Sequence, residues 1–469
     1  MNAAASAFTS ILDQISLSPE QFGGSVDIIG EDPIVASPHR IGAANAAAAA
    51  AHAAGIAAIW RLRTGREQAI RVDVRRAVVP GLLPMNYLSQ NGYALGWRAR
   101  KRVPNFFPTK DGRRFYLLHA MDYPQLLLRT LEFLDCSDAE ASIAKVIARW
   151  NAGELEEALA EHKLVGGIAR SREEWAEHPQ GRWLAAQPVV AIEKIGESEP
   201  EPFGPAQRPL SGIRVLDMGH VLAGPTAART LAEQGADVLR ISSPGNPDPN
   251  IQLMDTGFGK RSAYIDLDQV DDVDRLYALA READVLTQSW RPGALDGRGF
   301  SPEELAARRP GLIYLSVSCY GSGGPWWNRG GYDPLGQAVC GMSFDEGTPD
   351  KPQLVPTFTL NDYVTAYLGA AGVTAALIRR AHEGGSYHIT VSLTRSSMFV
   401  QELGLLPEAA RRTERTVPEA DPAHVMRTMS PWGELGHAAP IVEYSETKAA
   451  WERPSEPLGT SRAAWKELR

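Results

Sequence analysis

The strongest constraint on the fold is a regular alternation of short apolar runs and amphipathic stretches between residues 213 and 317. Short runs rich in Ile, Val and Leu predict buried strands, and the stretches between them predict helices. Strands that alternate with helices indicate an α/β fold, in which a parallel sheet carries helices on both faces and the functional crevice lies at the carboxyl ends of the strands. The predicted strands are Ile213–Met218, Ala236–Ile241, Ser262–Leu267, Ala283–Thr287 and Leu312–Val317, and the predicted helices are Thr226–Gln234, Val273–Glu282 and Pro302–Arg309.

A proline-rich stretch before this alternation marks a domain boundary. Residues 196–209 hold four prolines, start with acidic residues and show no apolar period, so they predict a linker. Upstream, FFPTKDGRRFYLL predicts two strands joined by the turn Asp111-Gly112, which open a small α+β unit. The predicted organisation is an N-terminal segment (1–100), a small α+β domain (101–195), the linker (196–209), a Rossmann-like sheet domain (210–400) and a C-terminal tail that returns to the body (401–469).

One pattern of elements occurs twice along the chain. A long helix rich in Ala and Leu is predicted over Tyr363–His382, followed by two glycines and the strand His388–Leu393. In the N-terminal half an alanine-rich helix also ends at a glycine and precedes a short strand. The repeat predicts that residues 40–80 echo residues 362–400.

Composition argues against several classes of protein. Forty-eight basic and 56 acidic residues give a net charge of −8, which does not suggest a nucleic-acid binder. Ala43–Trp60 carries no charge over 18 residues, but alanine gains little from lipid, so we expect a buried helix rather than a membrane span. The N-terminus lacks the pattern of a secretory signal. Three cysteines without metal-type or redox-type spacing indicate core thiols in a reducing cytoplasm.

The common catalytic motifs are missing from the sequence. There is no GxGxxG after a strand, no GxxxxGK[ST], no HExxH and no GxSxG, which disfavours a dinucleotide fold, a P-loop and the usual serine hydrolase. The ten histidines form no metal-like cluster.

Five longer segments, in a fixed order, resemble one family. They are PLSGIRVLDMGHVLAGPTAARTLAEQGADVLRI (209–241), GKRSAYIDL (259–267), ADVLTQSWRPGALDGRGF (283–300), LIYLSVSCYGSGGPWWNRGGYDPLGQAVCG (312–341) and LNDYVTAYLGAAGVTAALIRR (360–380). Together they are similar to the family III CoA-transferases, the superfamily of formyl-CoA transferase, carnitine CoA-transferase and α-methylacyl-CoA racemase. The tail, residues 442–459, resembles the closing segment of that family. The N-terminal half of this chain resembles the family's small-domain half, but the order is rearranged. In the family the small domain follows the nucleophile-bearing helix, whereas here the matching stretch precedes the sheet domain.

The resemblance implies a role for Asp362. By position alone an aspartate before a helix is a cap, but members of the family carry their nucleophilic aspartate at this place. Such a carboxylate attacks a thioester to form a mixed anhydride, and CoA then returns to give an aspartyl-CoA thioester before an acceptor carboxylate completes the exchange. The implied function is acyl-CoA:carboxylate CoA-transfer, with acyl-CoA and a carboxylic acid as substrates and no tightly bound cofactor. Because the sequence has no acidic residue between Asp32 and Glu67, the echoed helix offers no second nucleophile, and we expect one active site per chain.

Tyr332 and Asp333 help to choose among the reactions of the superfamily. The racemase branch has a histidine where Tyr332 stands and uses it with the aspartate as an acid/base pair. A tyrosine, with an ordinary pKa near about 10, is a poor partner for that proton transfer. Asp333 is either a second active-site carboxylate or a turn residue before a proline.

The resemblance also implies where CoA binds. The implied contacts are Leu222, Ala223, Ser243, Ile265, Asp266, Leu267, Ser289, Trp290, Arg291, Arg298, Arg329, Tyr332 and Asp333. Ser243 and Asp268 stand where the family often has arginine and lysine, so two positive charges of the phosphate clamp are lost. Either Arg298, Arg329 or a residue of the N-terminal half compensates for them, or CoA binds weakly.

Three functions compete at this stage: a CoA-transferase, an acyl-CoA racemase or epimerase on the same fold, and a CoA-binding member of the family without turnover. The absence of a GGGGQ-type loop argues against formyl and oxalyl substrates. Trp326 and Trp327 suggest a hydrophobic acyl chain. The resemblance implies an interlocked homodimer, and we expect neither a nucleic-acid partner nor a membrane.

Overall fold

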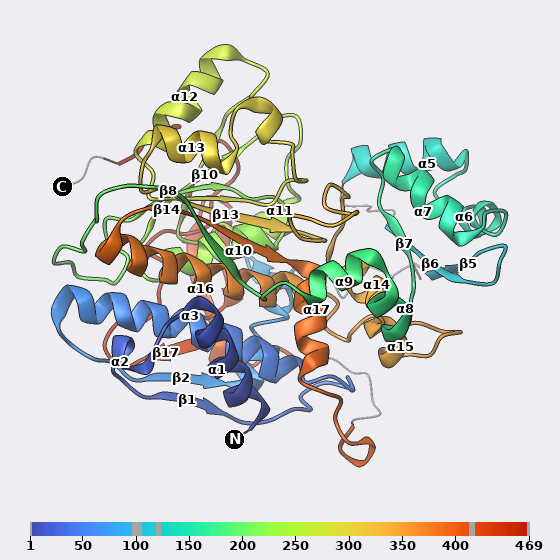
Figure 1. The fold of residues 1–469 in the computed structure, drawn as a ribbon, viewed down its shortest axis with the longest axis horizontal. Helices are drawn as coiled ribbons and strands as arrows, with labels where there is room; N and C mark the ends of the chain where they lie inside the picture. Colours follow the sequence, from blue (N-terminus) through green and yellow to red (C-terminus); the bar gives the residue numbers. More distant parts are fainter. Residues whose placement is uncertain (1, 96–105, 119–122, 412–417, 467–469) are drawn as a thin grey trace.

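A seven-stranded sheet is the largest element of the computed structural model, which describes residues 2–95, 106–118, 123–411 and 418–466 (Figure 1). The strand order is β11-β10-β9-β12-β13-β14-β8, and every neighbouring pair is parallel except β14 and β8. The bounds are β8 Ala191–Gly196, β9 Arg214–Met218, β10 Asp237–Ser242, β11 Lys260–Tyr264, β12 Val285–Gln288, β13 Ile313–Ser318 and β14 Ser386–Ser392. The mixed α/β class with a largely parallel sheet is therefore confirmed.

One predicted strand runs too far. The sequence predicts a strand over Ser262–Leu267, whereas β11 ends at Tyr264. The backbone N–H of Asp266 donates to the side chain of Asp272, at 2.8 Å, instead of to a neighbouring strand. The chain therefore leaves the sheet at this point.

Helices cover both faces of the sheet because successive residues of a strand point to opposite sides. On β9, Val215 belongs to the apolar cluster that includes α10 (Ala223–Ala232) and α16 (Leu360–Glu383). Its neighbour Leu216 belongs to the cluster that includes α12 (Val270–Arg281) and α13 (Pro302–Arg308). In Figure 1, α12 and α13 lie above the sheet and α16 lies below it.

The N-terminal segment forms a further layer on α16. The helix α3 (Ile41–Thr64) packs along α16, and α1 (Ala3–Ile15) packs on α3. By length and composition α3 is apolar enough to cross a membrane, yet its apolar window is fully buried inside the protein, as the sequence predicted for this stretch. Behind α3 lies a small sheet of β1 (Val26–Ile29), β2 (Ile70–Asp73) and β17 (Val442–Tyr444), so the C-terminal tail returns to the N-terminal layer.

A smaller lobe stands beside the main sheet, on the right of Figure 1. It holds the antiparallel sheet β5 (Phe106–Pro108), β6 (Arg114–Leu117) and β7 (Gly166–Ile168) with the helices α5 (Pro124–Leu134), α6 (Glu140–Ile147) and α7 (Ala152–Glu161). The two strands predicted around Asp111-Gly112 are β5 and β6. The chain then passes through α8 (Arg172–Glu177) and α9 (Pro179–Ala185) into β8, which joins the main sheet.

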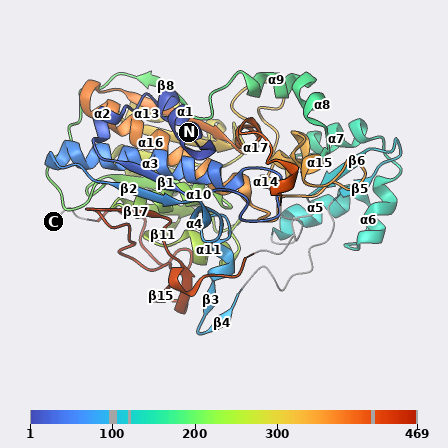
Figure 2. The same cartoon turned by 90° about the horizontal axis from the view of Figure 1, so that it is seen from below.

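The remaining elements complete these layers. A four-stranded sheet of β15 (Val425–Ser430), β16 (Gly433–Ala438), β3 (Ser89–Gln90) and β4 (Tyr93–Ala94) projects at the bottom of Figure 2. The other helices are α2 (Pro19–Phe22), α4 (Val74–Val78), α11 (Asn250–Thr256), α14 (Asp333–Val339), α15 (Met342–Glu346) and α17 (Leu393–Glu402). All three cysteines are free; Cys319 and Cys340 are buried, as predicted, and Cys136 is half-buried.

Candidate active site

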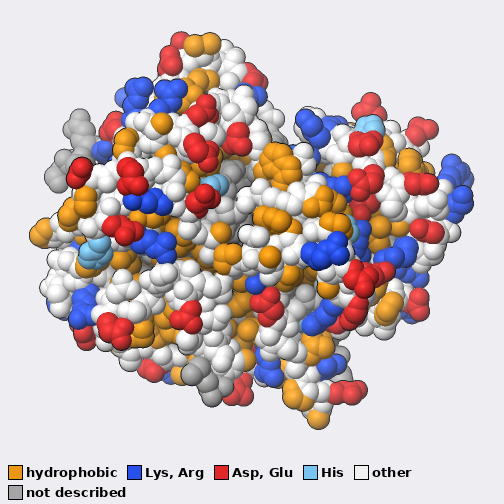
Figure 3. Space-filling view, in the orientation of Figure 1, with side chains coloured by type: hydrophobic (Ala, Val, Ile, Leu, Met, Phe, Trp, Pro, Cys, Tyr) orange, Lys and Arg blue, Asp and Glu red, His pale blue; other side chains and the backbone are white. Residues whose placement is uncertain are grey.

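A cavity of about 550 Å³ opens between the small lobe and the carboxyl ends of the parallel strands. The molecular surface is notched between the lobe and the main body (Figure 3). Loops after β9, β10, β12 and β13 form one wall, and the start of α5 with Lys163 and Val165 forms the other. Both halves of the chain thus contribute to one cavity, at the edge of the sheet where the alternation predicted a functional crevice.

Asp362 lies in this cavity, at the amino end of α16. The sequence predicts it just before the helix, but α16 begins at Leu360, so Asp362 is its third residue. Only 6% of Asp362 is exposed, and among the residues that the structure describes none donates a hydrogen bond to its carboxylate. Burial, together with the negative charge of Asp333, holds the pKa of Asp362 well above its ordinary value. A desolvated carboxylate without a hydrogen-bond partner is a stronger nucleophile than one in water.

Asp333 holds the helix that carries Asp362. Its Oδ2 accepts the backbone N–H of Asp362 at 2.9 Å, and its backbone carbonyl accepts the Asn361 side-chain amide at 3.1 Å. The side-chain amide of Gln337 donates to its other oxygen. Burial raises the pKa of Asp333 as well. Asp333 is therefore committed to capping α16, and its carboxylate already has partners on both oxygens.

The echoed helix α3 supports this division of roles. Both α3 and α16 have 24 residues, and the third residue is Ala43 in one and Asp362 in the other. The carboxylate of Asp32 accepts the N–H groups of Gly42 and Ala43, at 3.0 and 2.8 Å, as Asp333 accepts that of Asp362. A carboxylate that caps the helix therefore occurs at both α3 and α16. Only α16 has a further carboxylate, that of Asp362, which accepts no hydrogen bond from the described residues.

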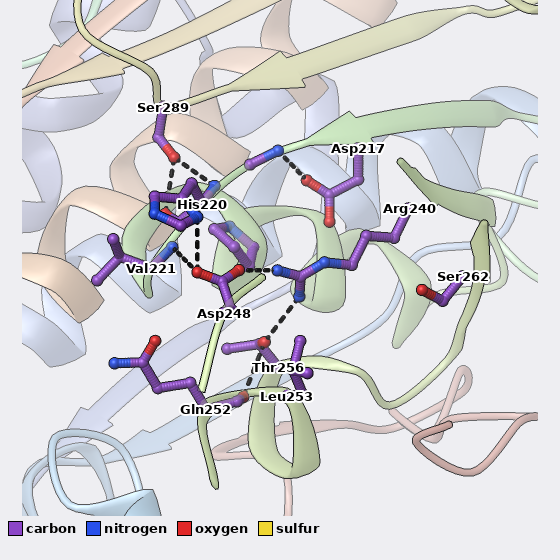
Figure 4. Close-up of polar contacts among 12 residues, drawn as sticks. Asp217, His220, Val221, Arg240, Asp248, Gln252, Leu253, Thr256, Ser262 and Ser289 are labelled. Atoms are coloured by element: carbon purple, nitrogen blue, oxygen red, sulfur yellow. Dashed lines mark hydrogen bonds and ion pairs between the residues drawn. The ribbon is translucent and has the colours of Figure 1, made fainter. Parts of the chain in front are cut away.

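A buried polar network holds the loop after β9 (Figure 4). His220 Nδ1 lies 2.6 Å from Asp248 Oδ1, and Arg240 pairs with the other oxygen of Asp248. The backbone N–H of Val221 donates to Asp248 at 3.0 Å, although Val221 has a φ of 66°, which a β-branched residue rarely adopts. Ser289 Oγ accepts the N–H of His220 and donates to its carbonyl, both at 2.8 Å. These contacts fix the imidazole of His220 at the wall of the cavity.

Four cationic side chains gather where the small lobe meets the cavity. Arg129 donates to the carbonyl of His162 at 2.7 Å, and Arg291 donates to the carbonyl of Lys163 at 3.1 Å. Arg329 pairs with Glu157 on α7 at 2.5 Å. Within the described residues, no carboxylate forms an ion pair with Arg129, Lys163 or Arg291. The mouth of the cavity therefore carries excess positive charge, which favours an anionic ligand.

The structure brings together about half of the residues predicted from the sequence. The cavity is lined by Asp362, Ala223, Ser289, Trp290, Arg291, Arg329 and Tyr332. Leu222, Ser243 and Asp333 lie beside lining residues without lining the cavity themselves.

The remaining predicted contacts lie outside the cavity. Residues 265–267 follow the edge strand β11, two strands away from β9. Arg298 forms an ion pair with Asp268 at 2.8 Å and does not reach the cavity. The contact of these residues with CoA stays a prediction.

Several lining residues were not predicted from the sequence. The N-terminal half supplies Tyr123, Arg129 and Lys163, and the sheet domain supplies His220 and Cys319. The cations of the N-terminal half carry no local motif, so only the tertiary fold shows them. A histidine directly after a strand and a glycine, in a predicted crevice loop, was a signal that could have been used for His220.

Two other lining groups are not suited to proton transfer. Burial raises the pKa of Tyr332 to about 12 and that of Cys319 to about 12. Neither group ionises near neutral pH. No group of three His, Cys, Asp or Glu residues that could hold a metal ion occurs in the described part of the chain.

Comparison with known proteins gives a consistent picture. Residues 210–432 match the family model of CoA-transferase family III. The chain is 34% identical over 319 residues to an acetyl-coenzyme A transferase of Hypoxylon pulicicidum, covering 63% of this chain and 53% of the relative. It is 37% identical over 230 residues to the succinyl-CoA–L-malate CoA-transferase alpha subunit of Chloroflexus aurantiacus, covering 44% and 54%. A solved structure of a CaiB/BaiF family protein from Brucella suis aligns at 30% identity and a TM-score of 0.39, over 42% of this chain and 56% of that one. The chain spans about half the length of the curated relatives it matches.

Proposed function

We propose that the protein is an acyl-CoA:carboxylate CoA-transferase with Asp362 as its nucleophile, because residues 210–432 match the model of CoA-transferase family III. The observation that carries the proposal is the state of the Asp362 carboxylate. It is buried, has no hydrogen-bond donor among the described residues, and lies at the amino end of a long helix in a cavity with a cationic mouth. The helix end stabilises negative charge that develops on the attacked carbonyl.

The transfer proceeds through Asp362 in four bond exchanges. The carboxylate attacks the thioester carbon, and the C–S bond breaks to give a mixed anhydride and CoA thiolate. The thiolate attacks the aspartyl carbon, the acyl carboxylate leaves, and an aspartyl-CoA thioester remains. The acceptor carboxylate then enters by the reverse of these steps and leaves as a new acyl-CoA. Each step conserves charge, and no proton has to be added or removed.

The cations at the mouth hold the phosphates of CoA. The sequence lacks the two positive charges expected at positions 243 and 268. Arg129 and Lys163 of the N-terminal half line the cavity together with Arg291, and none of the three forms an ion pair within the described residues. Such cations form charge-assisted hydrogen bonds with phosphate oxygens. The N-terminal half thus supplies the compensation that the sequence requires.

The racemase alternative is disfavoured at position 332. The racemase branch that the sequence resembles has a histidine there, whereas burial raises the pKa of Tyr332 to about 12, so this side chain does not exchange protons near neutral pH. The expectation of a hydrophobic acyl chain also loses its basis, because neither Trp326 nor Trp327 lines the cavity. The apolar lining comes from smaller residues, including Leu126, Val165 and Leu393.

The test of the nucleophile is Asp362→Asn. The variant keeps the size and polarity of the side chain, and it leaves the cap of α16 intact because Asp333 supplies it. We expect normal folding and CoA binding, with transfer to a labelled acceptor acid reduced by several orders of magnitude. Mass spectrometry of the wild-type protein incubated with donor is expected to show the mass of CoA added to the peptide that contains Asp362. Full turnover in the variant would show that Asp362 is not the nucleophile.

A further inference from the structure

A second polar group faces the same cavity as Asp362 and has no part in the steps above. His220 lines the cavity, and Asp248 lies 2.6 Å from its Nδ1. Asp248 and Arg240 behind it keep only 3% and 2% of their side chains exposed. Among the described residues no group pairs with the other ring nitrogen of His220, Nε2. The protein thus buries an ion pair behind an imidazole whose free nitrogen is left for a ligand (Figure 4).

The imidazole of His220 is held rigidly. Its ring stacks on Trp290 with 4.6 Å between centroids and 7° between planes, and the ring of Tyr123 meets it edge-on at 5.3 Å. The left-handed backbone of Val221, which is costly for a β-branched residue, is retained by its hydrogen bond to Asp248. The carboxylate of Asp248 on Nδ1 fixes the orientation of the ring, and when the ring carries a proton on both nitrogens its Nε2–H is a hydrogen-bond donor.

His220 and Asp362 lie at the same end of two packed helices. The helix α10 starts three residues after His220 and packs along α16, near whose start Asp362 lies. The ring of Tyr123 connects the surroundings of His220 with those of Asp362. Its centroid is 5.3 Å from the ring of His220 and 6.0 Å from the ring of Tyr332, whose neighbour in the chain, Asp333, contacts Asp362. A thioester that Asp362 attacks therefore lies in the cavity that the imidazole of His220 also lines.

We propose that His220, as an imidazolium, holds the CoA sulfur while it is a thiolate. The inference rests on the proposed transfer through Asp362. When the C–S bond breaks, its electron pair stays on sulfur, and Nε2–H of His220 donates a hydrogen bond to that sulfur. The proton remains on the nitrogen, so the thiolate is stabilised and still able to attack the aspartyl carbonyl. Asp248 acts as the positioning residue, through its bond to Nδ1.

The test compares three acyl donors in wild-type protein and in His220→Gln. The donors are acyl-CoA, the acyl thioester of N-acetylcysteamine and the acyl thioester of thiophenol. We expect kcat/KM of the variant to fall by about 10²-fold with the first two, whose alkyl thiolates need stabilisation. We expect almost no loss with the thiophenyl ester, because its thiolate is stable without help. His382→Gln, an exposed residue at the far end of α16, is the matched control and is expected to behave as wild type.

The donor series separates the possible outcomes. A loss with acyl-CoA alone would mean that His220 binds the pantetheine arm, and an equal loss with all three donors would mean a structural role; either result overturns the inference but leaves the transferase proposal standing. A wild-type protein that transfers no CoA would overturn both. A second variant, His220→Ala, is expected to regain alkyl-thioester activity when free imidazole is added, which a misfolded protein would not do.

Discussion

At the scale of single residues, the site depends on two buried carboxylates that differ in their partners. Asp333 has donors on both oxygens and caps a helix, as Asp32 does at the echoed helix. Asp362 has no donor among the described residues and stands where the echoed helix has Ala43. Burial raises the pKa of both members of the pair at α16. The assignment of nucleophile and cap follows from these hydrogen bonds and not from the two residue types, which are identical.

The pH dependence of transfer is expected to report the Asp362–Asp333 pair. Asp362 has to be ionised to attack, and its pKa is raised by burial and by the charge of Asp333. Hence kcat/KM is expected to rise with pH, and the midpoint of this rise is expected at a higher pH than the ordinary pKa of an aspartate. Asp333→Asn removes the neighbouring charge but still accepts the Asp362 N–H, so the midpoint is expected to move to lower pH. A midpoint that stays in place would show that Asp362 does not govern it.

One arginine at the cavity and one away from it provide a matched pair for testing CoA binding. Arg291 lines the cavity without an acidic partner among the described residues, whereas Arg427 pairs with Glu434 outside it. We expect Arg291→Ala to weaken CoA binding by about 1.5–3 kcal/mol, the worth of a charge-assisted hydrogen bond, and Arg427→Ala to have no effect. Titration calorimetry measures both. Equal affinity of the two variants would remove Arg291 from the phosphate site.

At the scale of elements, the helix pair α3 and α16 is the frame of the site. A Cβ placed at Gly55 on α3 would lie 2.1 Å from Oγ1 of Thr374 on α16, so the two helices approach as closely as a glycine allows. Asp362 lies near the start of the same helix. The packing of α3 therefore determines where the nucleophile stands relative to the loops of the sheet.

Gly55→Ala tests this contact. We expect a loss of about 1–3 kcal/mol in the free energy of unfolding, because the added methyl group has to push two buried helices apart. Gly153→Ala on α7 is the control: a Cβ there meets nothing within 4 Å, so the usual preference of helices for alanine is expected to stabilise the protein slightly. Denaturant unfolding gives both values. An unchanged or higher stability of Gly55→Ala would contradict the close packing.

The elements could be predicted further than the site. The apolar runs of the main sheet and the length of α16 follow from local periodicity, and only details differ, such as the end of β11 at Tyr264. The resemblance located Asp362, but the starting residue of α16 has no capping side chain that would mark it. The position of His220 after a strand marks it as a candidate, but its partner Asp248 comes from another loop and could not be predicted. Arg129 carries no local pattern that could identify it, because it reaches the cavity only through the packing of the lobe on the sheet domain.

At the scale of the whole molecule, the question is whether the small lobe and the sheet domain of the same chain form one active site, or whether the lobe of a partner chain completes it. In this structure the lobe and the sheet of one chain enclose one cavity, since Tyr123, Arg129 and Lys163 line it together with Asp362. The homodimer implied by the family resemblance stays a prediction, with an expected interface above about 2,000 Å². Sedimentation of dilute protein as a monomer would contradict it.

Mixing two inactive variants distinguishes a cavity formed within one chain from one shared between chains. One variant carries Asp362→Asn, and the other carries Arg129→Ala with Lys163→Ala; both are refolded together and assayed at limiting acyl-CoA. If each cavity is built from one chain, every cavity in the mixture keeps one defect, and no activity returns. If the lobe instead covers the partner's cavity, half of the cavities in each mixed dimer combine two intact walls, and about a quarter of wild-type activity returns. We expect no recovery, because a single chain already places its lobe cations and its Asp362 in the same cavity. A wild-type protein taken through the same refolding is the control for loss of folded protein, and recovery near a quarter of its activity would show that the active site is shared.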